Sequence, residues 1–134
     1  METNLKTNTS YQIFDMNTIT VYGIPNCDTT KKTLDWYQKN NIGVDFHDYK
    51  KYGIKIEKLR KWCKELGWEK LLNKKSTTWR SLPLEEQQRV TNEKAAIHLM
   101  MEYTSIIKRP VIEMNNIIMA GFNEKYFTNN KKKQ

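Results

Sequence analysis

The sequence has little of the material from which metal sites, disulfide frameworks and membrane spans are built. Its 134 residues include two cysteines and two histidines, too few for a disulfide framework or a structural zinc site with four ligands. No segment approaches the roughly 18 consecutive apolar residues of a membrane-spanning helix. Residues 1–17 lack the basic start and apolar run of a secretory signal. We therefore expect a cytoplasmic protein with no metal ion and no membrane association.

Positive charge is in excess, but it is not concentrated along the sequence. The chain has 23 Lys and Arg against 15 Asp and Glu, a formal net charge of +8. A basic surface attracts phosphates nonspecifically, whereas specific nucleic-acid binding needs a clustered stripe or a recognised module. The sequence shows neither, so nonspecific nucleic-acid binding ranks last among the functions considered.

Length and patterning predict one domain between two polar ends. A chain of this length is about one domain. Residues 1–17 and 128–134 lack the apolar side chains that offset the entropy of ordering, so we interpret them as a flexible extension and a flexible basic tail. The folded domain is then expected to span residues 18–127, as a monomer.

Residues 18–49 have the pattern of a strand, a helix and a second strand. The run TITVYG at 18–23 is β-branched and aromatic and ends at a glycine, which predicts a strand. Less polar residues at helical spacing predict a helix over 29–41, and alternating polarity predicts a strand over 44–49. A β-α-β unit of this kind forms a parallel pair of strands.

The rest of the chain is predicted to form helices followed by a hairpin. Apolar steps of three and four predict a helix over 56–66, residues 71–82 read as irregular, and Pro83 suits a helix start. The remaining predicted elements are a helix over 91–103, a hairpin of 111–114 and 117–120, and a closing helix over 122–127. The order β-α-β, helices, β-β-α predicts an α/β fold of the thioredoxin-like (glutaredoxin-like) type, with a helical insertion between its halves.

Cys27 is the strongest candidate for chemistry. It lies between the first predicted strand and helix, in GIPNCDTTKKTLDWY, where unpaired backbone N–H groups and the positive end of the helix dipole favour a thiolate. Lys31, one turn later, is expected to add positive charge, and Asp28 opposes it. The alternative interpretation is that Cys27 is a small buried apolar residue, as free cysteines usually are.

The second cysteine does not form a redox pair with the first. Cys63 lies in the middle of an apolar helical stripe, so we interpret it as structural. The position three after Cys27 is Thr30, and there is no CxxC motif. A resolving thiol would therefore come from glutathione or from a second protein, through a mixed disulfide.

Two further groups are candidates for binding an anion. Arg109 precedes Pro110 at the start of the predicted hairpin, and a cis-proline at this place in a thioredoxin-like fold abuts the active-site cysteine. That arrangement would bring Arg109, a planar and permanently charged donor, close to Cys27. A solvated arginine at a strand entrance is the alternative. The other group, which also reads as a solvated basic turn, comprises Lys74, Lys75 and Arg80.

The two histidines offer no catalytic pair. His47 lies in a predicted strand and His98 in a predicted helix. The sequence places no catalytic partner beside either of them. We interpret both as structural or exposed.

Three motifs follow one another along the domain: GIPNCDTTKKTLDWY, STTWRSL, and IKRPVIE with Gly121-Phe122 after it. Through them the chain resembles the ArsC/Spx family of thioredoxin-like proteins, and within it the YffB-type branch. The resemblance implies that Cys27 matches the nucleophilic cysteine of arsenate reductases and that Lys31 and Arg109 match basic residues of their site. In those reductases the cysteine and several arginines bind an oxyanion, and glutathione with glutaredoxin resolves the arsenylated enzyme.

The chain departs from the pattern of arsenate reductases in two places. Lys75 is the best match to an arginine that family members commonly carry, and Gly121 and Phe122 stand where a third arginine is missing. Arsenate is therefore not the expected substrate. The Spx branch implies a different function, a regulator that binds RNA polymerase, although its members usually carry the CxxC motif that Thr30 breaks.

The leading hypothesis is a glutathione-dependent thiol oxidoreductase that uses Cys27 as its nucleophile. We expect the substrate to be a small anion or a thiol compound whose anionic group is bound by Lys31, Arg109 and Lys75, with Thr30 and Pro110 shaping the site. The reductant is expected to be glutathione or a glutaredoxin-like protein, with no bound cofactor. The alternative is a non-enzymatic, Spx-like regulator bound to RNA polymerase.

Overall fold

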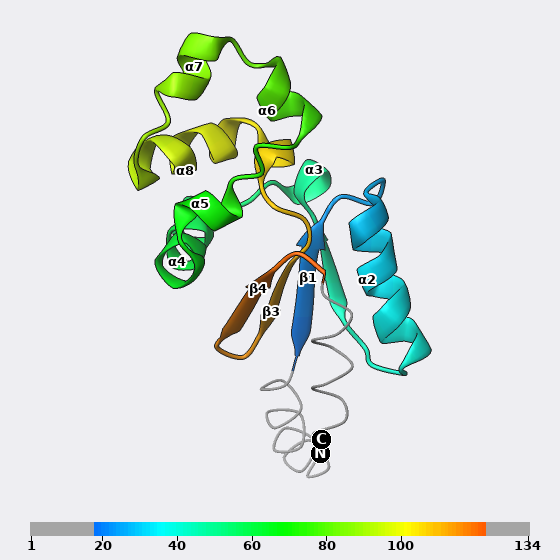
Figure 1. Ribbon diagram of the computed structural model, residues 1–134. Coiled ribbons are helices and arrows are strands. Elements are labelled where there is room, and N and C mark those ends of the chain that lie inside the picture. The colour runs from blue at the N-terminus through cyan, green and yellow to red at the C-terminus, as the bar shows by residue number, and fades with distance from the viewer. Residues whose placement is uncertain (1–17, 123–134) are drawn as a thin grey trace.

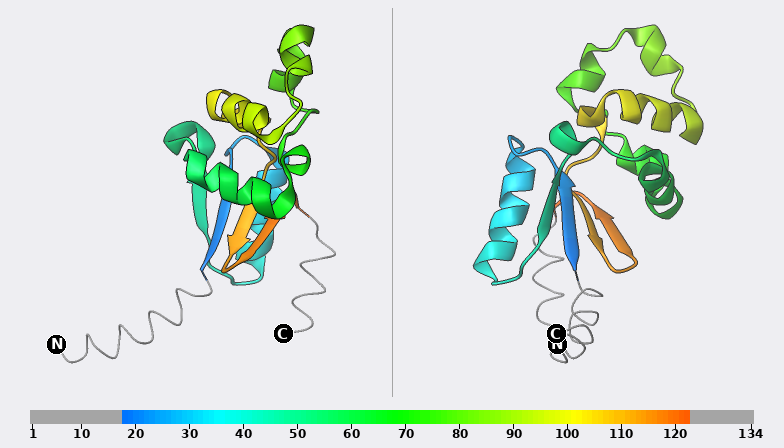
Figure 2. Two further views of the ribbon diagram at one scale, coloured as in Figure 1. Left: turned by 90° about the vertical axis from the view of Figure 1, so that its left-hand side faces the viewer. Right: turned by 180° about the vertical axis from the view of Figure 1, so that it is seen from behind.

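The fold is built on a mixed sheet of four strands with helices on both faces (Figures 1 and 2). The computed structural model describes residues 18–122. The strands lie in the order β2-β1-β3-β4, where β1 pairs parallel with β2 and antiparallel with β3. Their bounds are β1 Ile19–Gly23, β2 Asp45–Asp48, β3 Val111–Met114 and β4 Ile117–Ala120. This arrangement confirms the predicted α/β, thioredoxin-like order.

One face of the sheet is covered by α2 (Asp28–Lys39) (Figure 1). The helix buries Thr30, Thr33 and Tyr37, the stripe that helical spacing predicts. Tyr37 packs with the apolar side chains that β1 and β3 turn to this face, Val21 and Ile112 among them. Because α2 starts a few residues after β1 ends, the N-terminus of the helix lies at one end of the sheet.

The segment between β2 and β3 is a helical insertion whose core lies against the other face of the sheet. Trp62 and Leu59 of the second of its helices are fully buried there, together with Val111 of β3. In chain order the helices are α3 (Tyr49–Tyr52), α4 (Ile56–Leu66), α5 (Trp68–Leu71), α6 (Thr77–Ser81), α7 (Leu84–Gln88), α8 (Glu93–Glu102) and a 3₁₀ turn, Thr104–Ile106. None of the helices in residues 18–122 is long and apolar enough to cross a bilayer.

The structure corrects the prediction that residues 71–82 are irregular. This stretch holds the end of α5 and all of α6, helices too short for apolar periodicity to reveal. The Ser76 hydroxyl accepts a hydrogen bond from the Trp79 N–H (3.1 Å), which caps α6, and Trp79 is buried. The Ser76 cap and the buried Trp79 thus stabilise α6, which has no repeating stripe of apolar residues. The predicted hairpin and the helix start at Pro83 are confirmed, whereas the predicted closing helix over 122–127 lies almost wholly outside the described residues.

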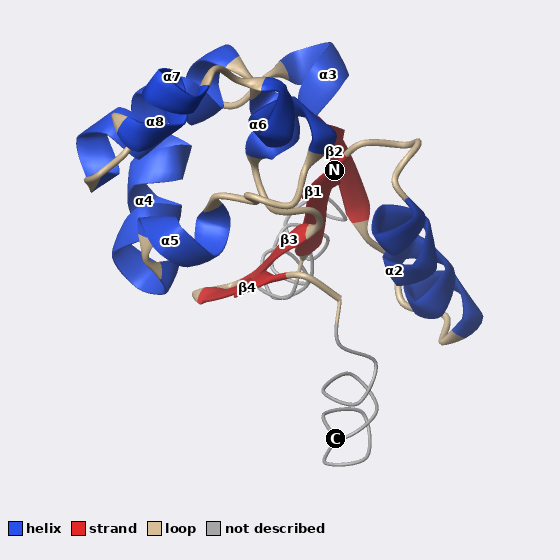
Figure 3. Cartoon of the chain, turned by 45° about the horizontal axis from the view of Figure 1, so that its top comes forward, coloured by secondary structure: helices blue, strands red, loops and turns tan. Residues whose placement is uncertain are grey.

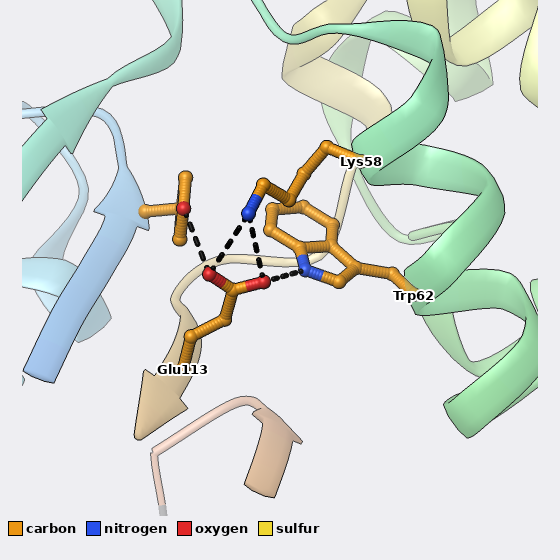
Figure 4. Close-up of polar contacts among 4 residues, drawn as sticks. Lys58, Trp62 and Glu113 are labelled. Atoms are coloured by element: carbon orange, nitrogen blue, oxygen red, sulfur yellow. Dashed lines mark hydrogen bonds and ion pairs between the residues drawn. The ribbon is translucent and has the colours of Figure 1, made fainter. Parts of the chain in front are cut away.

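Glu113 of β3 joins the sheet to α4 through a hydrogen-bonded carboxylate (Figure 4). Its Oε1 accepts from the Tyr22 hydroxyl (2.9 Å) and Lys58 Nζ (3.1 Å), and its Oε2 accepts from Trp62 Nε1 (2.7 Å) and Lys58 Nζ (3.2 Å). Burial raises the pKa of Glu113, but the bonds from Trp62, Lys58 and Tyr22 outweigh it, so the pKa lies below its ordinary value. The ionised carboxylate is therefore the form that the fold stabilises.

Replacing Glu113 by glutamine should remove stability that depends on pH. A carboxyl whose pKa is depressed by folding contributes stability above its unfolded pKa of roughly 4.3 and loses it as the pH falls through the folded value. We expect Glu113→Gln to lower the free energy of unfolding by about 2–3 kcal/mol at pH 7, and the difference from the parent protein to shrink at pH 3. Urea denaturation at both pH values measures this, with the exposed Glu65→Gln as the control. A difference that stays constant with pH would contradict the assignment.

Candidate functional site

Cys27 occupies the N-cap position of α2, where the chain leaves the sheet. Its backbone is extended (φ −98°, ψ 125°), its N–H donates to the Ile24 carbonyl (3.1 Å), and its carbonyl accepts from the Lys31 N–H (2.9 Å). The thiol is partly exposed and packs against the edge of the core on the α4 side. The loop after β1 therefore presents the sulfur to the free N–H groups of the first helical turn, as the sequence pattern predicts.

Opposing effects set the pKa of the Cys27 thiol, and the net direction is downward. Burial raises it. The Thr30 N–H, the Thr30 hydroxyl, the Arg109 guanidinium and the Thr29 N–H lower it by donating toward the sulfur, and together they outweigh burial. Thiolate is the nucleophilic form of cysteine, so this environment favours a reactive sulfur.

Arg109 reaches Cys27 from the opposite side of the site, from the segment that enters β3. The Arg109–Pro110 peptide bond is cis, the form considered from the sequence for this X-Pro bond. The guanidinium Nη1 donates to the Ser105 carbonyl, which orients the side chain. The Pro110 carbonyl accepts from the Gly121 N–H (2.7 Å) and so ties this segment to the end of β4. Antiparallel pairing of β1 with β3 then places Arg109 beside the loop that carries Cys27.

Three buried side-chain atoms lack hydrogen-bond partners within the described residues, and they gather at this place. They are Thr30 Oγ1, Tyr49 Oη and Arg109 Nε. Thr30 and Arg109 interact with the Cys27 sulfur, and Arg109 interacts with the Tyr49 hydroxyl. Thr30 Oγ1 makes no hydrogen bond of ordinary geometry in this arrangement, although it lowers the pKa of Cys27. We therefore infer that the Thr30 hydroxyl donates to the Cys27 sulfur when the sulfur is ionised. Donors left without acceptors here are able to stabilise negative charge at or next to the sulfur.

Gly23 lets Thr30 approach the end of β1. A Cβ atom added at Gly23 would lie 2.6 Å from Thr30 Oγ1, closer than two such atoms can come. Thr30 itself is fully buried. The absence of a side chain at Gly23 thus leaves the space that the Thr30 hydroxyl occupies.

The other predicted anion-binding residues, Lys31 and Lys75, are not among the groups that shift the pKa of Cys27. Lys31 is exposed. Lys75 is also exposed and lies in a groove beside Lys108, with its carbonyl accepting from Arg80 Nη2 (2.9 Å). The roles assigned to Lys31 and Lys75 stay predictions.

Cys63 and the histidines have surroundings unlike that of Cys27. Cys63 is buried on α4, and burial followed by the charge of Glu93 raises its pKa to about 11. His47 Nε2 donates to the Gly53 carbonyl (2.7 Å), and His98 is exposed. No group of three or more His, Cys, Asp or Glu side chains in residues 18–122 is placed to hold a metal ion.

Sequence reasoning missed Tyr49 and Glu113. Tyr49 follows β2 directly and begins α3, a helix of four residues that leaves no periodic signal. Glu113 shares the face of β3 with Val111, so strand alternation would have placed an acidic side chain in the core and marked it as a paired group. The Ser105 carbonyl that orients Arg109 belongs to a 3₁₀ turn, and no sequence pattern predicts that turn.

The fold and the site define a thioredoxin-like protein in which one partly exposed cysteine has a lowered pKa, and comparison with known proteins gives the family. The model of the ArsC family matches residues 22–129, and the chain belongs to that family. An uncharacterized protein of Haemophilus influenzae is 41% identical over 109 residues, covering 81% of this chain and 95% of that one. The solved structure of a protein named YFFB has 40% identity and a TM-score of 0.78, covering 83% of this chain and 96% of that one.

A relative of lower sequence identity is named as a transcriptional regulator. The global transcriptional regulator Spx of Streptococcus mutans is 23% identical over 108 residues, covering 79% of this chain and 77% of that protein. The chain is thus similar both to a YFFB protein and to a transcriptional regulator. The ArsC/Spx resemblance found in the motifs is confirmed.

Removing the Thr30 hydroxyl should raise the pKa of Cys27. Thr30→Val keeps the shape of the buried side chain and loses the donor, so we expect the rate of iodoacetamide alkylation to shift to higher pH and to be slower at pH 7. Thr30→Ser keeps the hydroxyl and should leave the profile close to that of the parent protein. The measurement uses the Cys63→Ala background, so that one thiol is observed. Identical profiles for Thr30→Val and Thr30→Ser would show that the hydroxyl has no electrostatic role.

Proposed function

We propose that this protein is a thiol oxidoreductase in which Cys27 is the nucleophile and glutathione is the co-substrate. One observation carries the proposal: the Cys27 thiol has a lowered pKa and faces the buried, unpartnered donors of Thr30 and Arg109. A site of this kind stabilises the thiolate before reaction and a nearby anionic group of the substrate. Membership of the ArsC family and similarity to YFFB support this class of function.

The proposed reaction is a thiol–disulfide exchange in two steps. The Cys27 thiolate attacks one sulfur of a substrate disulfide, a new S–S bond forms to Cys27, the substrate S–S bond breaks, and the leaving thiolate takes a proton from water. The thiolate of glutathione then attacks the sulfur bound to Cys27, which releases the Cys27 thiolate and a disulfide containing glutathione. Each exchange breaks one S–S bond and forms another, so the two steps need no oxidant or reductant other than the substrate disulfide and glutathione.

An external thiol is proposed because the chain offers no suitable internal one. Cys63 is buried, with a pKa of about 11, so little of it is thiolate at neutral pH. Thr30 stands at the place of a resolving cysteine and is fully buried. Glutathione also carries carboxylates that suit the Arg109 guanidinium. Arsenate reduction is not proposed, because Arg109 is the one arginine that lowers the pKa of Cys27.

Cys27→Ser should abolish turnover without unfolding the protein. The change removes the nucleophile and nearly keeps its volume, so we expect loss on the order of a thousandfold or more. The assay follows the glutathione-dependent reduction of a small mixed disulfide, and intact mass after exposure to oxidised glutathione should show one adduct in the parent and none in the variant. Cys63→Ala is the matched control and should retain both. Full activity in folded Cys27→Ser protein would refute the proposal.

The relative named Spx favours a second candidate, a regulator that binds RNA polymerase. Binding without turnover should not depend on the Cys27 sulfur. Under this candidate, a pull-down from lysate should recover RNA polymerase subunits equally with the parent protein and with Cys27→Ser. Under the oxidoreductase proposal neither protein should recover them, and the mixed-disulfide assay should be positive.

A further inference from the structure

A groove of about 790 Å³ is lined by α5, by the chain that follows it and by the edge strand β4. Its floor is partly apolar and includes Leu66, Leu72 and Ile118. Its charged lining comprises one acidic side chain, Glu69, and four basic ones: Lys70, Lys74, Lys75 and Lys108. The fold therefore brings Lys108 beside a basic stretch at residues 70–75.

These four lysines are not neutralised by other side chains in the described part of the chain. The ion pairs found in residues 18–122 join Lys58 to Glu113 and Arg89 to Glu85, neither of which involves the groove. The Lys74 ammonium lies 5.5 Å from the centre of the Trp79 ring, which positions it without cancelling its charge. The groove thus keeps a net positive charge that a ligand can meet.

Residues of β4 line one side of the groove. This strand is the last of the sheet, as Figure 3 shows. Within the described residues β4 pairs with β3 alone. The Gly121 N–H donates to the Pro110 carbonyl, and antiparallel bonds alternate from there along the pair. By that alternation the N–H and C=O groups of Ile118 and Ala120 point away from β3. Two residues therefore present backbone groups at this edge that no group in residues 18–122 pairs with, and they lie in the same groove as the lysines.

We propose that this groove docks an extended acidic segment of a partner protein, which adds to the edge of β4 as a further strand. Backbone pairing to Ile118 and Ala120 would supply affinity, and acidic side chains on the segment would meet Lys70 and Lys74. A second copy of this chain is disfavoured as the occupant, because it would bring two sets of lysines together. The apolar floor favours an amphipathic peptide over a phosphate backbone, which carries no apolar side chains.

The groove leads toward the candidate active site. Lys108 adjoins Arg109 in the chain, and Gly121 at the end of the groove is bonded to Pro110. A segment bound along β4 would thus place its flanking residues near Cys27. The inference names the partner class of the proposed oxidoreductase and rests on that function for its purpose, whereas the docking itself needs no thiol.

Docking is tested with full-length Cys27→Ser protein and a fluorescein-labelled peptide in which glutamate alternates with valine, so that one face of the strand is acidic and the other apolar. Fluorescence anisotropy should show binding that weakens at least about tenfold, or 1.4 kcal/mol, when Lys70→Glu and Lys74→Glu are combined. Lys50→Glu with Lys61→Glu changes the net charge equally at exposed sites outside the groove and should weaken binding less than about threefold. Hydrogen exchange should show the Ile118 and Ala120 amides protected by the peptide.

Several results would overturn the inference. They are an absence of binding, equal weakening by the two lysine pairs, or unchanged exchange at Ile118 and Ala120 in the bound state. Tighter binding of an oligothymidine that displaces the peptide would assign the groove to nucleic acid. Because Cys27 is absent from the tested protein, failure of the thiol chemistry does not affect these results, and failure of docking leaves turnover of small disulfides intact.

Discussion

One partly buried carboxylate links the elements on which the geometry of the candidate site depends. Glu113 accepts hydrogen bonds from Tyr22 of β1 and from Lys58 and Trp62 of α4. Tyr22 is the residue before Gly23, where β1 ends, and Glu113 lies in the strand that follows Pro110. The same group therefore holds together the two segments that deliver Cys27 and Arg109. An unpaired buried carboxylate would be strongly unfavourable, so the network specifies this arrangement of β1, β3 and α4.

The surroundings of Cys27 combine partial burial with directed donors. Burial alone would keep the sulfur as an inert thiol. The Thr30 and Thr29 N–H groups are supplied by the start of α2, the Thr30 hydroxyl is positioned by Gly23, and Arg109 comes from the far end of the sequence. Local and distant parts of the chain thus act on one atom. Cys63, which lacks such donors, shows the result of burial without them, a pKa raised to about 11.

The sequence predicted the parts of this structure that local chemistry determines. β1, α2 and the hairpin were predictable because strand alternation, helical spacing and turn residues act over a few positions. The position of Cys27 at a helix N-terminus followed from them, and the approach of Arg109 followed from the thioredoxin-like order. Tyr49 and Glu113 were not found, because their importance comes from partners distant in sequence. The lysine groove was missed for the same reason. Lys70 and Lys108 line one groove because the chain after α5 pairs with the segment before β3, through the Leu72–Ile107 bridge and the bond from the Lys108 N–H to the Leu71 carbonyl.

Groups that attract negative charge lie both beside Cys27 and in the lysine groove. Their burial decides how strongly each group acts and how far salt screens it. Arg109 is partly buried and Thr30 fully buried, so their effect on the sulfur is strong, short in range and weakly screened by salt. The groove lysines Lys70 and Lys74 are exposed, where a single ion pair contributes little. Several exposed lysines beside an unpaired strand edge can still select an acidic partner, because they add to backbone pairing that is itself indifferent to sequence. The buried donors thus act on the Cys27 sulfur, while the exposed lysines and the strand edge form the surface on which the proposed acidic segment would dock.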